Sequence, residues 1–464
     1  MFGVGAVLGA ALASLLGHHY GRRLCLMTLA VLDLLGWLVM ATSTNLGMLV
    51  GSRFLSGCAG GGYMLCVQVY VGEISQTHQR AWLLALSAPI TALGIITMYV
   101  SSGLLPWHCA AASCLPVPAA LAIVMIFYWD TPSWLALSSR PQLVRAALSQ
   151  YRGEDYVGLE LEINKVLQQQ QHSGLSTVRI VRNIFSEKRY FKPFLILNSL
   201  NLLGKYILIH FHNNNNSSSV LLCGKFAVDH YSVEVFVRFG SDLSLYVAEL
   251  VAALLTLVGS LMLLPLVRWM SRKSLLSLSS AVMAVSLLLL GFCSYSHSQD
   301  MELLRDCDWL PITCVVSYIM ATNMGLSALP NIFISEFYPS HVSHRLQSTE
   351  LNSWKIFQMR IVMGGLTLTL ANMEILAARA LFSALEQKLA KYALLWLFSA
   401  NCLFVMMFTC QYIPETRNRS EDVIETKFVR LGKVVRASPW VTPCPSPSAT
   451  SVRRLHFKTH LFTQ

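Results

Sequence analysis

Residues 243–294 read LSLYVAELVAALLTLVGSLMLLPLVRWMSRKSLLSLSSAVMAVSLLLLGFCS. They contain two apolar stretches, 243–267 and 274–294, joined by a turn with Arg268, Arg272 and Lys273. A helix needs about 20 apolar residues to cross the hydrocarbon core of a bilayer, and each stretch is about that long. Short basic turns between spans favour the cytosolic side. This segment therefore predicts two transmembrane helices joined at the cytosolic face.

The same pattern extends over most of the chain. The hydrophobic share is 54% and the charged share only 13%, whereas soluble domains average about 25% charged residues. The net charge of +11 lies largely in short loops, where it orients helices, so we expect a lipid bilayer and not nucleic acid as the partner. The sequence predicts an all-α membrane protein whose other apolar stretches are 2–17, 25–42, 46–71, 82–105, 109–128, 191–211, 219–237, 309–334, 352–374 and 390–412.

A polar interval divides these stretches into two groups. Residues 1–128 form the predicted N-terminal bundle and 191–412 the C-terminal bundle. Between them, 129–190 is predicted to be a cytosolic loop with short helices, because 140–171 has helical spacing with charged faces. The tail 413–464 is predicted to be cytosolic and largely disordered, since it is basic and, beyond residue 428, rich in Pro and Ser.

Two features depart from a regular series of spans. Residues 204–220, GKYILIHFHNNNNSSSV, interrupt one span with polar residues that lipid cannot satisfy. They are interpreted as a retained intron or, alternatively, as an external loop with a glycosylation sequon at Asn216. Counting the interrupted stretch as one span leaves eleven. A cytosolic Arg22-Arg23 turn then places Met1 outside, which predicts one further span before residue 2 in a longer protein.

Seven short motifs resemble those of the sugar porters in the major facilitator superfamily, in the family's order and spacing. They are GHHYGRR at 17–23, GSRFLSG at 51–57, YVGEI at 70–74 followed by Arg80, WDTPSWL at 129–135, YRG at 151–153, SEFYP at 335–339, and PETRNRS at 414–420 followed by Glu421 and Ile424.

The resemblance covers about residues 1–428 and is nearest to insect trehalose and hexose facilitators. It implies the major facilitator fold, two helical bundles with about eleven of twelve spans present. It also implies facilitated transport of a sugar-like solute by alternating access, in a multi-pass protein of the plasma membrane. The twelve cysteines have no CxxC or metal-ligand spacing, and no catalytic constellation occurs, so no enzyme activity, metal or cofactor is expected. The sequence makes no prediction of oligomeric state.

Charged residues at predicted cytosolic helix ends form a candidate gating network. Glu73 and Glu336 would be costly there without partners, and Arg53, Arg80 and Arg345 are the predicted ones. Such ion pairs would hold the bundles together and break when they rock. The alternative is that they are ordinary interfacial charges. The complete predicted network is Arg22, Arg23, Arg53, Glu73, Arg80, Arg272, Glu336, Arg345 and Glu415.

Several positions depart from the family pattern. His18 and Arg268 stand where the family's two loop copies have Asp, and Ala88 and Phe226 replace cavity amides. The polar residues left as candidate cavity residues are Thr91, Tyr231, Thr256, Asn323, Asn331, Asn352 and Trp354, each of which could instead make a helix–helix contact. These losses keep two alternatives open: a transport-inactive homologue acting as a sensor or partner subunit, and a facilitator of a less hydroxylated organic solute.

Overall fold

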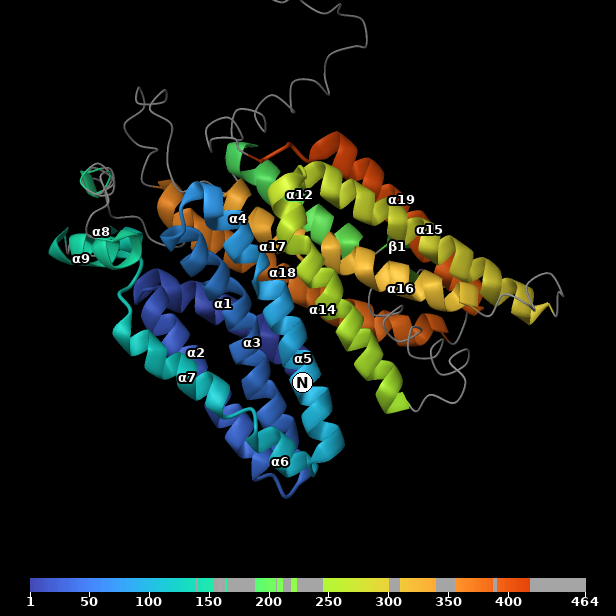
Figure 1. Cartoon of the computed structure of the whole chain (residues 1–464), viewed down its shortest axis with the longest axis horizontal. Coiled ribbons are helices and arrows are strands. Elements are labelled where there is room, and N and C mark those ends of the chain that lie inside the picture. Colours follow the sequence, from blue (N-terminus) through green and yellow to red (C-terminus); the bar gives the residue numbers. More distant parts are fainter. Residues whose placement is uncertain are drawn as a thin grey trace, which may run out of the picture.

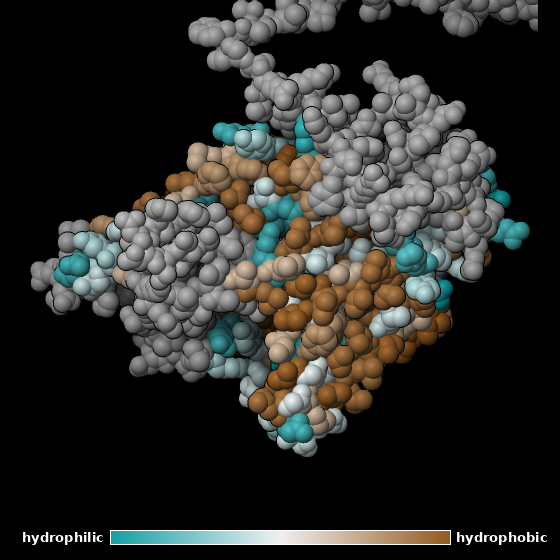
Figure 2. Space-filling view, turned by 180° about the vertical axis from the view of Figure 1, so that it is seen from behind, coloured by the Kyte–Doolittle hydropathy of each residue, from teal (hydrophilic) through white to brown (hydrophobic). Residues whose placement is uncertain are grey.

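The computed structural model describes residues 1–137, 141–153, 158, 160, 163–164, 188–205, 207–211, 218–222, 245–299, 309–338, 355–386 and 390–417. Within these ranges, ten helical segments are long and apolar enough to cross a membrane, and the shorter apolar helix Phe191–Leu203 accompanies them. The predicted all-α membrane fold is confirmed. Apolar side chains cover much of the exposed helix surface, which is the surface that lipid requires (Figure 2).

The helices before residue 128 form the first bundle (Figure 1). Two of the apolar stretches break inside the membrane region: α4 ends before Leu86, and α7 begins with Pro116, which suits the first turn of a helix because it has no N–H to leave unpaired. The elements are α1 (Phe2–His19), α2 (Arg22–Ala41), α3 (Leu46–Ile74), α4 (Thr77–Ala85), α5 (Ser87–Leu104), α6 (Trp107–Ala112) and α7 (Pro116–Phe127).

The helices after residue 188 form the second bundle (Figure 1). Here the break after Met324 is again followed by a proline, Pro330, in the first turn of the next helix. The elements are α12 (Lys188–Lys205), α14 (Leu245–Trp269), α15 (Arg272–Ser298), α16 (Trp309–Met324), α17 (Leu329–Phe337), α18 (Lys355–Glu386) and α19 (Lys391–Tyr412).

Two short helices lie beside the first bundle in the predicted cytosolic interval (Figure 1). They are α8 (Pro132–Leu137) and α9 (Pro141–Arg152), and they have a small apolar core of their own that includes Leu135, Val144 and Leu148. The part of 129–190 beyond these helices falls mostly outside the described residues, as does the tail from residue 418.

The interrupted span differs from a continuous helix. α12 ends at Lys205, and β1 (Ile207–Phe211) pairs antiparallel with β2 (Ser218–Leu222), with Ile207 opposite Leu222. The hairpin therefore falls on the interval 204–220 that the sequence marks as an insert. Residues 223–244, where the span was expected to resume, lie outside the described ranges. The origin of the insert and the span expected before residue 2 stay predictions.

The two bundles meet along two pairs of helices. α1 packs on α18, where the Ser14 hydroxyl donates to the Ile361 carbonyl (3.2 Å) and the Asn372 amide donates to the Ala6 carbonyl (3.3 Å). α5 packs on α14, where the Tyr246 hydroxyl donates to the Tyr99 carbonyl (3.2 Å) (Figure 1). The groups that make these three hydrogen bonds are neutral, and none of the three contacts is an ion pair.

Candidate functional site

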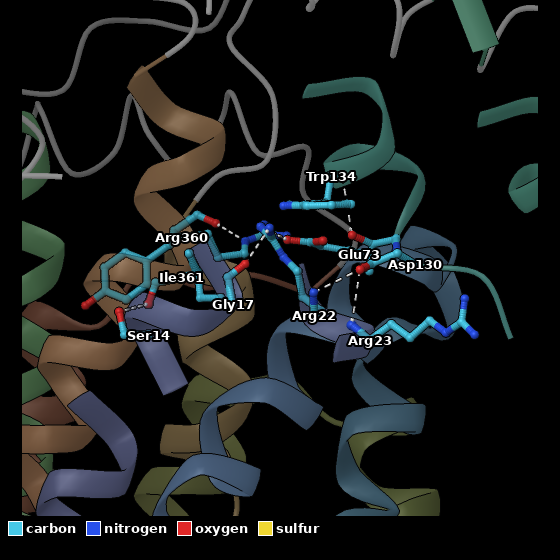
Figure 3. A network of polar contacts seen from close by, with 11 residues as sticks. Ser14, Gly17, Arg22, Arg23, Glu73, Asp130, Trp134, Arg360 and Ile361 are labelled. Carbon is cyan, nitrogen blue, oxygen red and sulfur yellow. Dashed lines mark hydrogen bonds and ion pairs between the residues drawn. The ribbon is translucent and has the colours of Figure 1, made fainter. Parts of the chain in front are cut away.

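The N-terminus of α2 is capped by the carboxylate of Asp130, which follows α7, the last helix of the first bundle (Figure 3). The backbone N–H groups of Arg22 and Arg23 donate to the two Asp130 oxygens at 3.2 and 3.3 Å. The first N–H groups of a helix have no partner within the helix, and its N-terminus favours negative charge. Gly21 has a φ of 96°, and a side chain there would overlap the Asp130 carboxylate, so this turn requires glycine.

The side chains of Arg22 and Arg23 connect α2 to three more helices of the same bundle. Arg22 donates to the Gly17 carbonyl of α1 (3.1 Å) and pairs with Glu73 of α3 at 3.0 Å; both side chains are 1% exposed. Arg23 donates to the carbonyls of Met125 (2.8 Å) and Ile126 (2.8 Å) at the end of α7, where a cation is favoured. We refer to this end as the cytosolic end, following the predicted orientation.

The second bundle repeats the arrangement. The backbone N–H groups of Arg272 and Lys273 donate to Glu415 at 3.2 and 3.3 Å. The Arg272 guanidinium donates to the Val267 carbonyl (2.7 Å) and lies 3.6 Å from Glu336, while the Lys273 ammonium donates to the Cys410 carbonyl (2.6 Å). Each bundle thus closes its own cytosolic end with one capping carboxylate, two consecutive cations and one helix-end glutamate.

The two capping carboxylates differ in their electrostatic surroundings. Burial raises the pKa of Asp130, although Arg22 and the N–H groups of Thr131 and Arg23 oppose this effect. Burial also acts to raise the pKa of Glu415, but the N–H groups of Arg417, Lys273 and Arg272 and the Ser271 hydroxyl lower it overall. The same hydrogen-bonding role therefore comes with opposite pKa shifts, because Asp130 is the more deeply buried group.

The network as described contains most of its predicted members. Arg22, Arg23 and Glu73 meet in the first bundle, and Arg272, Glu336 and Glu415 in the second. Arg80 lies within electrostatic reach of Glu336 across the bundles. Arg345 falls outside the described residues.

Arg53 was placed in this network wrongly. It lies in the first turns of α3, whereas Glu73 lies at the opposite end of the same continuous helix. Because a helix rises about 1.5 Å per residue, the two are about 30 Å apart along the axis. The Arg53 guanidinium instead lies 6.0 Å from the centre of the Trp37 ring, at the outer end of α2.

Three of the candidate cavity residues bond within their own helices. Thr91 donates to the Ser87 carbonyl (2.8 Å), Thr256 to Ala252 (2.9 Å) and the buried Asn323 to Ile319 (2.9 Å), which favours a packing role. Asn331 is half-buried at the start of α17 and makes no hydrogen bond within the described structure. Tyr231, Asn352 and Trp354 lie outside the described residues.

Besides Asp130 and Lys273, which the predicted network did not include, two further residues were missed from the sequence. The Arg360 side chain, 1% exposed, donates to the carbonyls of Tyr338 (2.8 Å) and Ser335 (3.0 Å) and so caps the end of α17. Gln68 is buried on α3, and its Oε1 has no partner among the described residues. Both interrupt apolar stretches, 352–374 and 46–71, and an arginine or amide inside a predicted span was the available signal.

Two bundles of apolar helices with a duplicated charged network define a polytopic membrane transporter. The chain belongs to the sugar (and other) transporter family, whose model matches residues 1–428. Members of this family are transporters and not enzymes.

Curated relatives and solved structures agree with this assignment. The chain is 25% identical to the facilitated trehalose transporter Tret1 of Bombyx mori over 432 residues, which cover 93% of this chain and 78% of that protein. It is 26% identical to the Tret1-2 homolog of Drosophila sechellia over 440 residues, covering 94% and 83%. The proton:xylose symporter XylE bound to 6-bromo-6-deoxy-D-glucose aligns with a TM-score of 0.68 at 16% identity, covering 92% of this chain and 87% of that one. The predicted major facilitator fold is confirmed.

Proposed function

We propose that this protein carries a hexose or trehalose across the plasma membrane by facilitated alternating access of its two bundles. The observation that carries the proposal is the duplicated network at the cytosolic end. Arg22–Glu73 and Arg272–Glu336 each lie within one bundle, so each bundle is held as a body of its own. Two bodies whose contacts along α1–α18 and α5–α14 are neutral can rock about a site between them.

The substrate class rests on the relatives and on the polar groups available. The relatives named above are facilitated trehalose transporters, and sugar hydroxyls are bound by groups that both donate and accept, such as amides. Gln68 and Asn331 supply amides that are not engaged by another described residue. Gln68 lies on the same face of α3 as Leu65 and Gly72, which approach Gly364 and Ser335 of the other bundle. We infer that these two amides face the solute path between the bundles.

A less hydroxylated organic solute is the second candidate. The side chains of Thr91, Thr256 and Asn323 donate hydrogen bonds to carbonyls of their own helices, so among the candidate cavity residues that the structure describes few polar groups remain to bind a sugar. A path of this polarity suits a solute with fewer hydroxyl groups.

Uptake of labelled solute in oocytes that express the full-length protein tests the proposal. We expect saturable, sodium-independent uptake of trehalose or of a hexose above water-injected controls. Inhibition by other organic solutes, with no sugar uptake, would support the second candidate. Surface protein with no uptake of any solute would support a transport-inactive homologue and would contradict both transport proposals.

A further inference from the structure

Arg268 and Trp82 meet across the bundles at the cytosolic end. Arg268 lies in the last turn of α14, and Trp82 lies in α4 of the first bundle. The guanidinium carbon is 4.7 Å from the centre of the indole ring. A cation within about 6 Å of an aromatic centroid is attracted by the ring's electrons, most strongly for Trp. This contact therefore joins the two bundles directly, in addition to the electrostatic effect of Arg80 on Glu336.

Arg268 has a counterpart in the first bundle that behaves differently. It stands four residues before Arg272, and His18 stands four residues before Arg22, so both occupy the same place in the repeated turn. His18 packs edge-on against its neighbour His19 (4.9 Å between ring centroids), whereas Arg268 reaches the opposite bundle. The two turns share their backbone caps, but they differ at this position: Arg268 contacts the opposite bundle, whereas the ring contact of His18 is with its neighbour His19.

Two neighbouring contacts between the bundles, at Ser14 and at Gly72, carry little directional attraction. The Ser14 hydroxyl donates to the Ile361 carbonyl, and a Cβ at Gly72 would lie 3.3 Å from the Ser335 Cβ. These contacts are ordinary packing that many small displacements would preserve. A cation over a ring face is different, because it is lost once the bundles separate by a few ångströms.

We propose that Arg268 and Trp82 form a cation–π clamp that favours the state with the cytosolic end closed. The clamp is a positioning device for the proposed transport cycle and rests on that function. Arg268 is exposed, and exposed cation–π pairs change an equilibrium by about 2–5-fold. Loss of either partner should therefore raise the open fraction by about that factor, with no change in the solute site.

Ser335 provides a reporter of opening. It is 2% exposed and faces Gly72 across the bundle boundary, and Cys is close to Ser in size. A cysteine in Ser335→Cys should react with a membrane-impermeant maleimide only when the cytosolic end opens. Inside-out vesicles present this end to the reagent, and mass spectrometry of the peptide with position 335 separates its alkylation from that of the native cysteines.

In the Ser335→Cys background, Trp82→Ala and Arg268→Gln should each speed alkylation about 2–5-fold. Trp82→Phe should stay closer to the original rate than Trp82→Ala, since it retains a ring face that attracts the cation less strongly than an indole does. Trp269→Ala is the matched control, because Trp269 is adjacent to Arg268 and 75% exposed, and it should have no effect. Thermal unfolding of each variant shows whether a faster rate comes from opening or from loss of fold.

Unchanged alkylation in both Trp82→Ala and Arg268→Gln would refute the clamp, as would an equal increase in Trp269→Ala. A cysteine at 335 that never reacts in any variant would contradict opening at this end and would also overturn the clamp. The measurement needs no sugar. If alkylation responds as expected while uptake of every sugar fails, the clamp stands and the substrate proposal falls.

Discussion

Asp130 and Glu415 occupy equivalent places in the two halves of the chain: each carboxylate receives two consecutive backbone N–H groups, at 3.2 and 3.3 Å. The helices that they cap, α2 and α15, each begin with two consecutive cations, Arg22-Arg23 and Arg272-Lys273. Each carboxylate also comes from the segment just after the last span of its bundle. The repeat therefore fixes α2 to the segment that follows α7, and α15 to the segment that follows α19, at this end.

Acid should act on these two carboxyls in opposite directions. The pKa of Asp130 is raised by burial, so its contribution to stability is present below its unfolded pKa and is lost as pH rises through the folded value. The pKa of Glu415 is lowered, so its contribution is present above its unfolded pKa and is lost as pH falls through the folded value.

Unfolding of the purified protein in detergent at a series of pH values measures this. The stability difference between wild type and Asp130→Asn should decrease as pH rises above about 3.9, the ordinary pKa of Asp. The difference between wild type and Glu415→Gln should decrease as pH falls below about 4.3, the ordinary pKa of Glu. Slopes of the same sign for the two variants would show that the two caps are electrostatically alike.

Loss of one partner of the Arg22–Glu73 pair should strongly destabilise the first bundle. Both side chains are 1% exposed, and Glu73→Gln would remove the carboxylate charge that is paired with the buried Arg22 guanidinium. Such losses cost about 3–5 kcal/mol, and the Arg22→Met/Glu73→Met double variant should recover much of it. Chemical unfolding in lipid–detergent micelles provides the measurement.

The Arg145–Glu160 pair is the control for this experiment. Its partners are 2.9 Å apart but 68% and 63% exposed, so Arg145→Ala should cost at most about 1 kcal/mol. If Glu73→Gln cost no more than this control, the Arg22–Glu73 pair would be an ordinary interfacial contact.

The spans were predictable because an apolar run of about 20 residues matches the thickness of the hydrocarbon core of a bilayer. The breaks inside the runs were harder, since Leu86 and residues 325–328 are no more polar than their surroundings. In the structure, prolines at 89, 116 and 330 lie in the first turn of the helix after each break. In the sequence alone, each proline is equally compatible with a kinked but continuous span. The hairpin depends on pairing between 207–211 and 218–222, and no pattern in the sequence predicted that these two segments would pair.

The sequence predicted most residues of the charged site, but it did not predict which of them contact one another. Basic loops identified Arg22 and Arg272, but the Asp130 carboxylate that caps α2 is 108 residues from Arg22 along the chain. Only the packing of α7 beside α2 brings the two together. Arg53 was misplaced because the motif at 51–57 was interpreted without its position in the helix. Arg53 lies near the start of the stretch 46–71, which should have placed it at the outer end.

The amides of Gln68 and Asn331 should determine solute affinity if the proposed path is correct. Asn331→Ala and Gln68→Ala should each raise the Michaelis constant about 5–10-fold, the loss expected for one hydrogen bond of about 1–1.4 kcal/mol. Thr256→Ala is the matched control, because its hydroxyl already bonds to Ala252. Concentration-dependent uptake gives the values, and equal effects of all three would remove the two amides from the path.

The crossing of α1 and α3 should tolerate no side chain at Gly9. A Cβ there would overlap the Cys58 carbonyl, and Gly61 makes an equally close approach to Ala6 on the same face, so the helices would have to move apart. Gly9→Ala should therefore lower the free energy of unfolding by about 1–3 kcal/mol, the usual cost of overpacking. Gly94→Ala is the control, since nothing lies within 4 Å of a Cβ at that position, and it should change stability by no more than about 0.5 kcal/mol. Both changes add one methyl group to a membrane helix and raise helix propensity, so a similar loss in the two variants would mean that the cost does not come from the α1–α3 contact.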